Sequence, residues 1–127
     1  MSFVDKLRQF PNLVSYGKAD LKAIEAAENT LDLCFAPEYK EYLSEFGAAS
    51  VEGYEFTGLV DLKFLNVVDV TSRLRKNNPS LDKMYVVEEV HVDGLVIWQD
   101  EAGQVYQTIP GSLPQKIANT LSEYLDV

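Results

Sequence analysis

The strongest structural signal in this sequence lies in Phe35-Ala36-Pro37-Glu38-Tyr39-Lys40-Glu41-Tyr42-Leu43-Ser44-Glu45-Phe46-Gly47. The proline fits the first turn of a helix, where its missing N–H costs nothing, and Gly47 fits the residue after the last turn. Apolar side chains recur between them at helical spacing, and charged side chains occupy the other side. The pattern therefore predicts a helix over 37–46. Its inner face is predicted to be Tyr39, Tyr42, Leu43 and Phe46.

Two helical patterns precede this segment. Ser2 and Asp5 resemble a helix start, and apolar residues then recur at helical spacing up to Pro11. A second helix is predicted to begin near Asp20. Glu28 lies near the apolar side of that helix by helical count, so we expect it to be half-buried and hydrogen-bonded. The inward side of the second helix is predicted to be Leu21, Ile24, Ala27 and Leu31.

Strand patterns dominate after Gly47. Alternating residues over 51–56 predict an edge strand that Gly58 interrupts. A valine-rich segment over 67–74 predicts another helix, which the turn residues Asn77-Asn78-Pro79 close. Further strands, joined in part as an antiparallel hairpin, are predicted over 84–87, 95–99 and 104–108.

The last part of the chain predicts a closing helix. Ser112 and Gln115 have the spacing of a capping box. The inner face of this helix is predicted to be Leu113, Ile117, Leu121 and Tyr124. Because the helices are grouped mainly before the strands, we expect an α+β fold, with a small antiparallel or mixed sheet packed against helices. The length fits one domain over 1–127.

The charge of the chain narrows the choice of partner. Lys and Arg number 11 against 20 Asp and Glu, so the formal net charge is −9. Such a surface repels phosphate backbones and anionic membranes, and we therefore expect neither direct nucleic-acid binding nor membrane binding. It attracts a basic protein, although acidity also serves solubility alone.

Residue types that carry chemistry are few. His91 is the only histidine, which excludes a two-histidine metal motif, and the glycine-rich loops that hold nucleotide phosphates are missing. We expect no catalytic, cofactor-binding or metal-binding residues, and therefore no enzyme. Carboxylates that could in principle form an acid/base pair lie near predicted turns, where we expect them to be solvated. These carboxylates are Glu88, Glu89, Asp93, Asp100 and Glu101.

Two residues are predicted to lie in the interior. Cys34 is the single cysteine, and its apolar neighbours predict a buried thiol. Trp98 lies in an apolar run that suits a strand buried on both faces, so a core position is favoured over an interface anchor.

No apolar run approaches the roughly 20 residues that span a bilayer, and the start of the chain is unlike a secretory signal. The sequence thus predicts a cytoplasmic protein.

The first half of the chain carries a recognisable pattern. Ile24 and Glu28 lie on one helix, and Pro37 and Tyr39 open the next one, which ends in Gly47. This order and spacing resemble the opening signature of the SUKH superfamily, which includes Smi/Knr cell-wall regulators and many bacterial immunity proteins. The later strands follow in the order typical of the family, so the resemblance covers roughly residues 21–106.

The resemblance implies a fold and a function. It implies a mixed sheet with helices around it and, for bacterial members, a non-enzymatic antitoxin that binds a cognate toxin, often a nuclease. The acidic charge is compatible with this role, because a nuclease must attract phosphate and an acidic inhibitor can compete for its basic cleft. Eukaryotic relatives act instead in signalling and cell-wall assembly.

We expect the partner to contact an acidic face that carries an aromatic residue. The residues predicted for this face are Glu52, Tyr54, Glu55, Glu88, Glu89 and Asp93. A regulatory scaffold of the Smi/Knr type and a carboxylate-based hydrolase that uses Glu88 or Asp100 are the alternatives. The toxin, the stoichiometry and the oligomeric state stay open.

Overall fold

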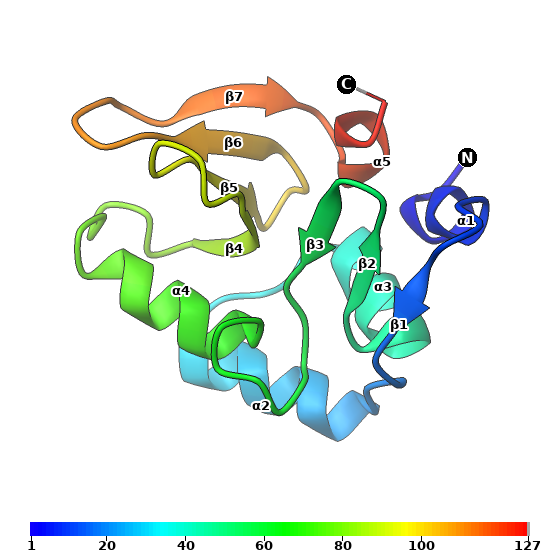
Figure 1. The fold of residues 1–127 in the computed structure, drawn as a ribbon. Helices are drawn as coiled ribbons and strands as arrows, with labels where there is room; N and C mark the ends of the chain where they lie inside the picture. The colour runs from blue at the N-terminus through cyan, green and yellow to red at the C-terminus, as the bar shows by residue number, and fades with distance from the viewer. Residues whose placement is uncertain (127) are drawn as a thin grey trace.

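Five helices and seven strands make up residues 1–126, the part of the chain that the computed structural model describes (Figure 1). The helices are α1 (Phe3–Arg8), α2 (Leu21–Leu31), α3 (Pro37–Phe46), α4 (Val67–Arg75) and α5 (Leu121–Tyr124). The strands are β1 (Val14–Ser15), β2 (Ala49–Val51), β3 (Tyr54–Phe56), β4 (Met84–Glu89), β5 (Val96–Asp100), β6 (Val105–Thr108) and β7 (Gln115–Ala118).

The strands form one open sheet whose spatial order follows the chain from β1 to β7. Every pair of neighbouring strands is antiparallel, and within residues 1–126 a single isolated bridge between Gly58 and Asn66 is parallel. The predicted α+β class is confirmed. Of the two sheet types that were expected, the antiparallel one is present.

Two hydrophobic cores cover the two faces of this sheet. Side chains alternate between faces along a strand, so Ile97 joins the core that contains α1, α2, α3 and α5, while its neighbour Trp98 joins the core beneath α4. The Trp98 indole is fully buried, and its Nε1 donates to the hydroxyl of Thr108 at 2.9 Å. The predicted core position of Trp98 is confirmed.

Helix α3 begins at Pro37 and ends at Phe46, just before Gly47, as predicted, and its inner face is buried. Two tyrosine hydroxyls on that face reach the residue that follows β3. Tyr39 Oη lies 2.9 Å from Thr57 Oγ1, and Tyr42 donates to the Thr57 carbonyl at 2.7 Å. These bonds satisfy buried polar groups and fix the helix against the sheet.

Helix α2 also begins where predicted, after Asp20, whose carboxylate accepts from the backbone N–H of Ala23 at 2.8 Å. Glu28 is half-buried and accepts from the N–H of Phe35 at 2.8 Å, which confirms the expectation for this residue. The inward assignment of Leu21 is wrong, because its side chain is 69% exposed. It lies in the first turn, before the buried stripe starts at Ile24.

The predicted closing helix from Ser112 is wrong. Strand β7 occupies Gln115–Ala118 and pairs with β6, and only the four residues Leu121–Tyr124 are helical. The helix is capped by Thr120, whose hydroxyl accepts from the N–H of Glu123 at 3.0 Å. Long-range pairing with the free edge of β6 therefore outweighs the local capping pattern at Ser112.

Two smaller expectations are also wrong. The pattern over 51–56 contributes to the β2–β3 hairpin inside the sheet, whereas the edge belongs to β1, a strand of two residues that was not predicted. Cys34 is exposed. Its neighbours Leu33 and Phe35 are both buried, so the extended backbone between α2 and α3 turns the intervening side chain outward.

Candidate protein interface

The β2–β3 hairpin presents the first group of predicted contact residues. Glu52 lies in its turn and Glu55 on β3, and both are exposed. Phe56, the next residue on β3, is buried in the core under α1 and α3. Because neighbouring side chains on a strand point to opposite faces, Glu55 points to the face of the sheet that α4 covers elsewhere.

Tyr54 lies on the same face of β3 as Phe56 and is half-buried. Its ring stacks on Phe56 at 5.6 Å between centroids, and it meets the edge of Tyr124 at 5.8 Å. These contacts link the hairpin to α5. Tyr54 therefore leaves only part of its ring for a partner, and it faces away from Glu55.

Glu88 is buried, with 5% of its surface exposed, so the expectation of a solvated carboxylate is wrong for this residue. It pairs with Phe56 across the β3–β4 ladder and accepts hydrogen bonds from Tyr124 Oη at 2.7 Å and from the Glu55 N–H at 3.0 Å. Desolvation by burial raises the pKa of this carboxyl above its usual value, although both hydrogen bonds act in the opposite direction. Glu88 joins β3, β4 and α5 and is not placed to contact a partner.

Glu89 points to the opposite face from Glu88. A bulge between Val86 and Glu88 shifts the register of β4, after which Glu88 pairs with Ile97 and Glu89 with Val96. The half-buried carboxylate of Glu89 forms an ion pair with Arg73 of α4 at 2.7 Å. The register thus places Glu89 on the same face of the sheet as Glu55.

Asp93 is exposed in the turn between β4 and β5. It adopts a positive φ of 54°, as His91 does at 63° and Gly94 at 72°. The predicted residues therefore fall into three groups. Glu52 and Glu55 lie on the hairpin, Glu88 and Tyr54 are held against α5, and Glu89 and Asp93 lie toward the β4–β5 turn.

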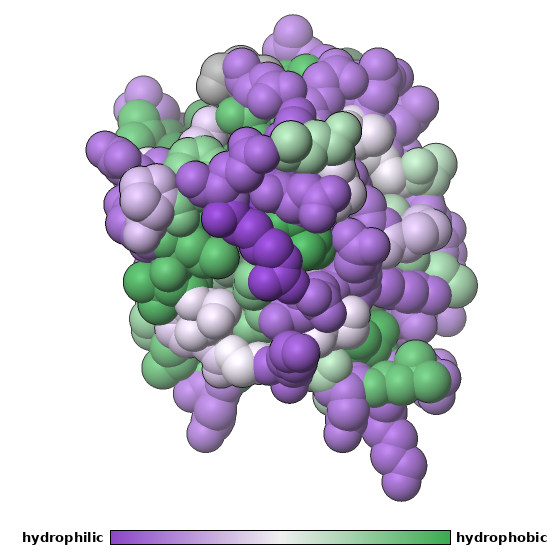
Figure 2. Space-filling view, turned by 90° about the vertical axis from the view of Figure 1, so that its right-hand side faces the viewer, coloured by the Kyte–Doolittle hydropathy of each residue, from purple (hydrophilic) through white to green (hydrophobic). Residues whose placement is uncertain are grey.

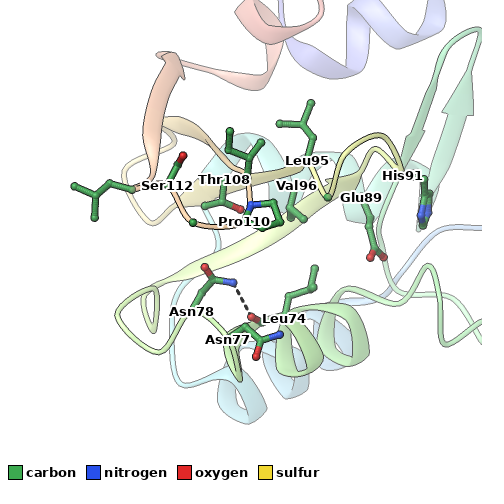
Figure 3. A pocket seen from close by; sticks show the side chains of 14 residues that line it. Leu74, Asn77, Asn78, Glu89, His91, Leu95, Val96, Thr108, Pro110 and Ser112 are labelled. Carbon is green, nitrogen blue, oxygen red and sulfur yellow. Dashed lines mark hydrogen bonds between the residues drawn. The ribbon is translucent and has the colours of Figure 1, made fainter.

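Sequence reasoning missed a groove of about 760 Å³ on the α4 side of the sheet (Figure 3). Its walls are the end of α4 with the turn after it, the β4–β5 turn, and the loop from β6 to β7. In Figure 3, Leu74 points from α4 toward the loop that carries Pro110, and Glu89 and His91 lie at the other end. Glu89 is thus both a predicted contact residue and part of the groove.

The rim of this groove is apolar and exposed. Leu113 is 88% exposed and Ile109 is 44% exposed, and both line the groove; Val92, in the adjacent turn, is 57% exposed. The sequence did not reveal the rim because its residues come from two separate loops, and because Leu113 was assigned to the inner face of a helix. The pair Leu113-Pro114 after Gly111 was the available signal for an exposed loop.

The hydrolase alternative finds little support in the surroundings of its two carboxylates. The buried carboxylate of Glu88 already accepts hydrogen bonds from Tyr124 and Glu55. Asp100 Oδ1 accepts from the N–H groups of Ala102 at 3.1 Å and Gln104 at 2.9 Å. Asp100 therefore shapes the β5–β6 turn. Among residues 1–126 no group of three or more His, Cys, Asp or Glu side chains is arranged to hold a metal ion.

One side of the molecule has a mainly hydrophilic surface (Figure 2). Figure 2 shows the side that carries α1 and the β1 edge, where hydrophilic residues cover most of the area and hydrophobic residues form smaller patches. No helix within residues 1–126 has the length and apolar character needed to cross a bilayer.

Comparison with models of known protein families shows the family to which the chain belongs. A family model described as "SUKH_5: SMI1-KNR4 cell-wall" matches residues 2–127, so the chain belongs to the SUKH superfamily. This confirms the resemblance drawn from the sequence and extends it over nearly the whole length. A search of curated proteins finds no match.

Proposed function

We propose that this protein is an immunity protein that binds and neutralises a cognate toxin in the cytoplasm of the producing cell and has no enzymatic activity of its own. Membership of the SUKH superfamily over residues 2–127 is the observation that carries this proposal. The net charge of −9 supports it, because a toxin such as a nuclease must be basic where it binds phosphate.

The proposed mechanism is occlusion of a basic surface. Glu52 and Glu55 are exposed on a short hairpin, and Glu89 and Asp93 extend the acidic character toward the β4–β5 turn. Carboxylates in this arrangement can take the places of substrate phosphates in a cationic cleft. Tyr54 adds part of an aromatic ring on the opposite face of the same hairpin, and aromatic residues commonly anchor protein interfaces.

Charge reversal on the hairpin tests this surface. The double variant Glu52→Lys, Glu55→Lys should bind the purified toxin domain at least tenfold more weakly, and the products of neighbouring genes are the candidates for that toxin. Both side chains are exposed, so its free energy of unfolding should stay within about 0.5 kcal/mol of wild type. Affinity is measured by titration calorimetry and stability by urea unfolding.

A matched control separates a local effect from a general change in charge. Glu25→Lys, Glu41→Lys changes the net charge equally on exposed positions of α2 and α3 and should bind as wild type does. Equal weakening of both double variants would reject the hairpin as the contact surface. If wild-type protein forms no complex with the product of any neighbouring gene, the immunity function itself is contradicted.

A regulatory scaffold is the second candidate function. The description of the matching family refers to the cell wall, and Smi/Knr-type proteins act in cell-wall regulation. The gene neighbourhood separates the two, because an immunity gene lies beside a toxin gene and a scaffold gene need not.

A further inference from the structure

The groove on the α4 side is open to solvent and is lined by apolar side chains together with polar ones, among them Asn77 and Asn78. Val96 of β5 belongs to the core beneath α4, Leu74 of α4 packs against that core, and the two residues form one side of the groove. Ile109 and Leu113 form the facing rim. Leu113 is 88% exposed and Leu74 is half-buried, so the groove exposes apolar side chains that no other part of residues 1–126 covers.

The walls of the groove are held in place before any partner arrives. Gly94 approaches Pro110 so closely that a Cβ at this glycine would lie 2.8 Å from the proline Cγ, which packs the β4–β5 turn against the β6–β7 loop. The loop is closed by a hydrogen bond from the Ser112 N–H to the Ile109 carbonyl at 3.2 Å. A preformed site loses little conformational entropy when it is filled.

Ionisable groups at one end of the groove define the charge of its ligand. Glu89 lines the groove, and Asp93 is exposed in the turn that forms its wall. His91 lines the same end, and Arg73 faces Glu89 from α4. Because Arg73 pairs with Glu89, the carboxylate of Asp93 and the net charge of −9 of the whole chain are what favour a cation at this end.

The volume suits a short peptide segment. A groove of about 760 Å³ falls within the range of roughly 300–1,000 Å³ that is usual for ligand sites. It can therefore accept one or two apolar side chains together with part of their backbone. The apolar rim and the acidic end together call for an occupant that is both apolar and basic.

We propose that the groove is a second contact region for the toxin, which inserts an apolar side chain between Leu74 and Leu113 and places a neighbouring lysine or arginine beside Glu89 and Asp93. This inference rests on the proposed function for the identity of the partner. It adds an apolar anchor to the acidic hairpin contact, and it assigns a role to the exposed leucine.

The first experiment measures binding of the toxin domain by rim variants. Leu113→Ser and Ile109→Ser should each weaken binding at least fivefold, and the double variant at least 20-fold, with unfolding by urea close to wild type. Leu21→Ser is the matched control, because Leu21 is an exposed leucine on α2 and does not line the groove. Wild-type affinity in the double rim variant would overturn the proposal, whatever the hairpin variants show.

A second experiment tests the groove without the toxin. A synthetic peptide of alternating lysine and leucine is titrated while the methyl signals of Ile109 and Leu113 are followed by NMR, and a peptide of alternating glutamate and leucine serves as the control. The proposal expects saturable shifts of both methyl signals with the basic peptide and at least tenfold weaker binding of the acidic one. Equal shifts with both peptides, or none, would overturn it. Failure of the proposed function is recognised separately, because no toxin complex would then form.

Discussion

At the scale of single residues, two glycines hold the fold together by having no side chain. A Cβ at Gly58 would lie 1.9 Å from the carbonyl oxygen of Gly47, and a Cβ at Gly47 would lie 1.8 Å from the carbonyl oxygen of Gly17. Three backbone segments therefore cross within van der Waals contact at this point. The sequence predicts Gly47 as the residue that ends α3. It does not show that Gly47 must also lack a side chain because the backbone of Gly17 lies against it.

Substitution of Gly58 tests this crossing. Gly58→Ala should lower the free energy of unfolding by about 3 kcal/mol or more, because its new methyl group meets rigid backbone. Gly53→Ala is the control, since a Cβ there has nothing within 4 Å and only the positive φ of 83° opposes it, at a cost of about 1 kcal/mol. Urea unfolding measures both, and equal stability of the two variants would contradict the crossing.

At the scale of elements, Glu88 joins parts of the chain that are distant in sequence. Its carboxylate accepts from β3 through the N–H of Glu55 and from α5 through Tyr124. The hydroxyl of Tyr124 in turn has its pKa raised, first by burial and then by this carboxylate. Glu88 was predicted to contact a partner because it is acidic. In the structure it instead connects the β2–β3 hairpin to β4 and α5.

This link predicts a pH dependence of stability. The pKa of Glu88 is raised in the folded protein, so the folded state holds the proton more tightly than the unfolded chain does. The contribution of Glu88 to the free energy of unfolding is therefore fully present below its ordinary pKa of 4.5 and is lost as pH rises through the raised folded value. Glu88→Gln, which stays uncharged, should gain stability relative to wild type across this window.

The measurement compares urea unfolding of wild type and variants at several pH values from 4 to 8. Glu25→Gln is the control, because Glu25 is exposed on α2 and should follow the wild-type profile. A constant difference between Glu88→Gln and wild type at every pH would show that burial does not perturb this carboxyl.

At the scale of the whole molecule, the acidic charge governs encounter more than affinity. Charged surfaces steer a partner of opposite sign over distances that salt shortens, with a Debye length of about 10 Å at 0.1 M. For the proposed basic toxin, raising NaCl from 50 to 500 mM should reduce the association rate at least tenfold and change the dissociation rate less. Stopped-flow mixing measures both, and an association rate independent of salt would exclude steering by the net charge.

Part of this fold could be predicted from local sequence. The helices at Asp20 and Pro37 are specified by caps and apolar spacing within a few residues, and the hairpin turn at 100–103 by its acidic and glycine residues. The acidic balance and the SUKH pattern are also properties of the sequence alone, and the family match over residues 2–127 confirms the pattern.

Only the tertiary structure shows the features that depend on contacts between residues distant in sequence. The 115–118 segment becomes a strand because β6 offers a free edge, and Glu88 is buried because a bulge in β4 turns it toward α5. The groove exists only where the end of α4 and two loops meet. The spacing of apolar residues within a segment indicates which of its sides is buried. Strand register, bulges and loop packing depend on contacts between segments, so only the folded chain determines them.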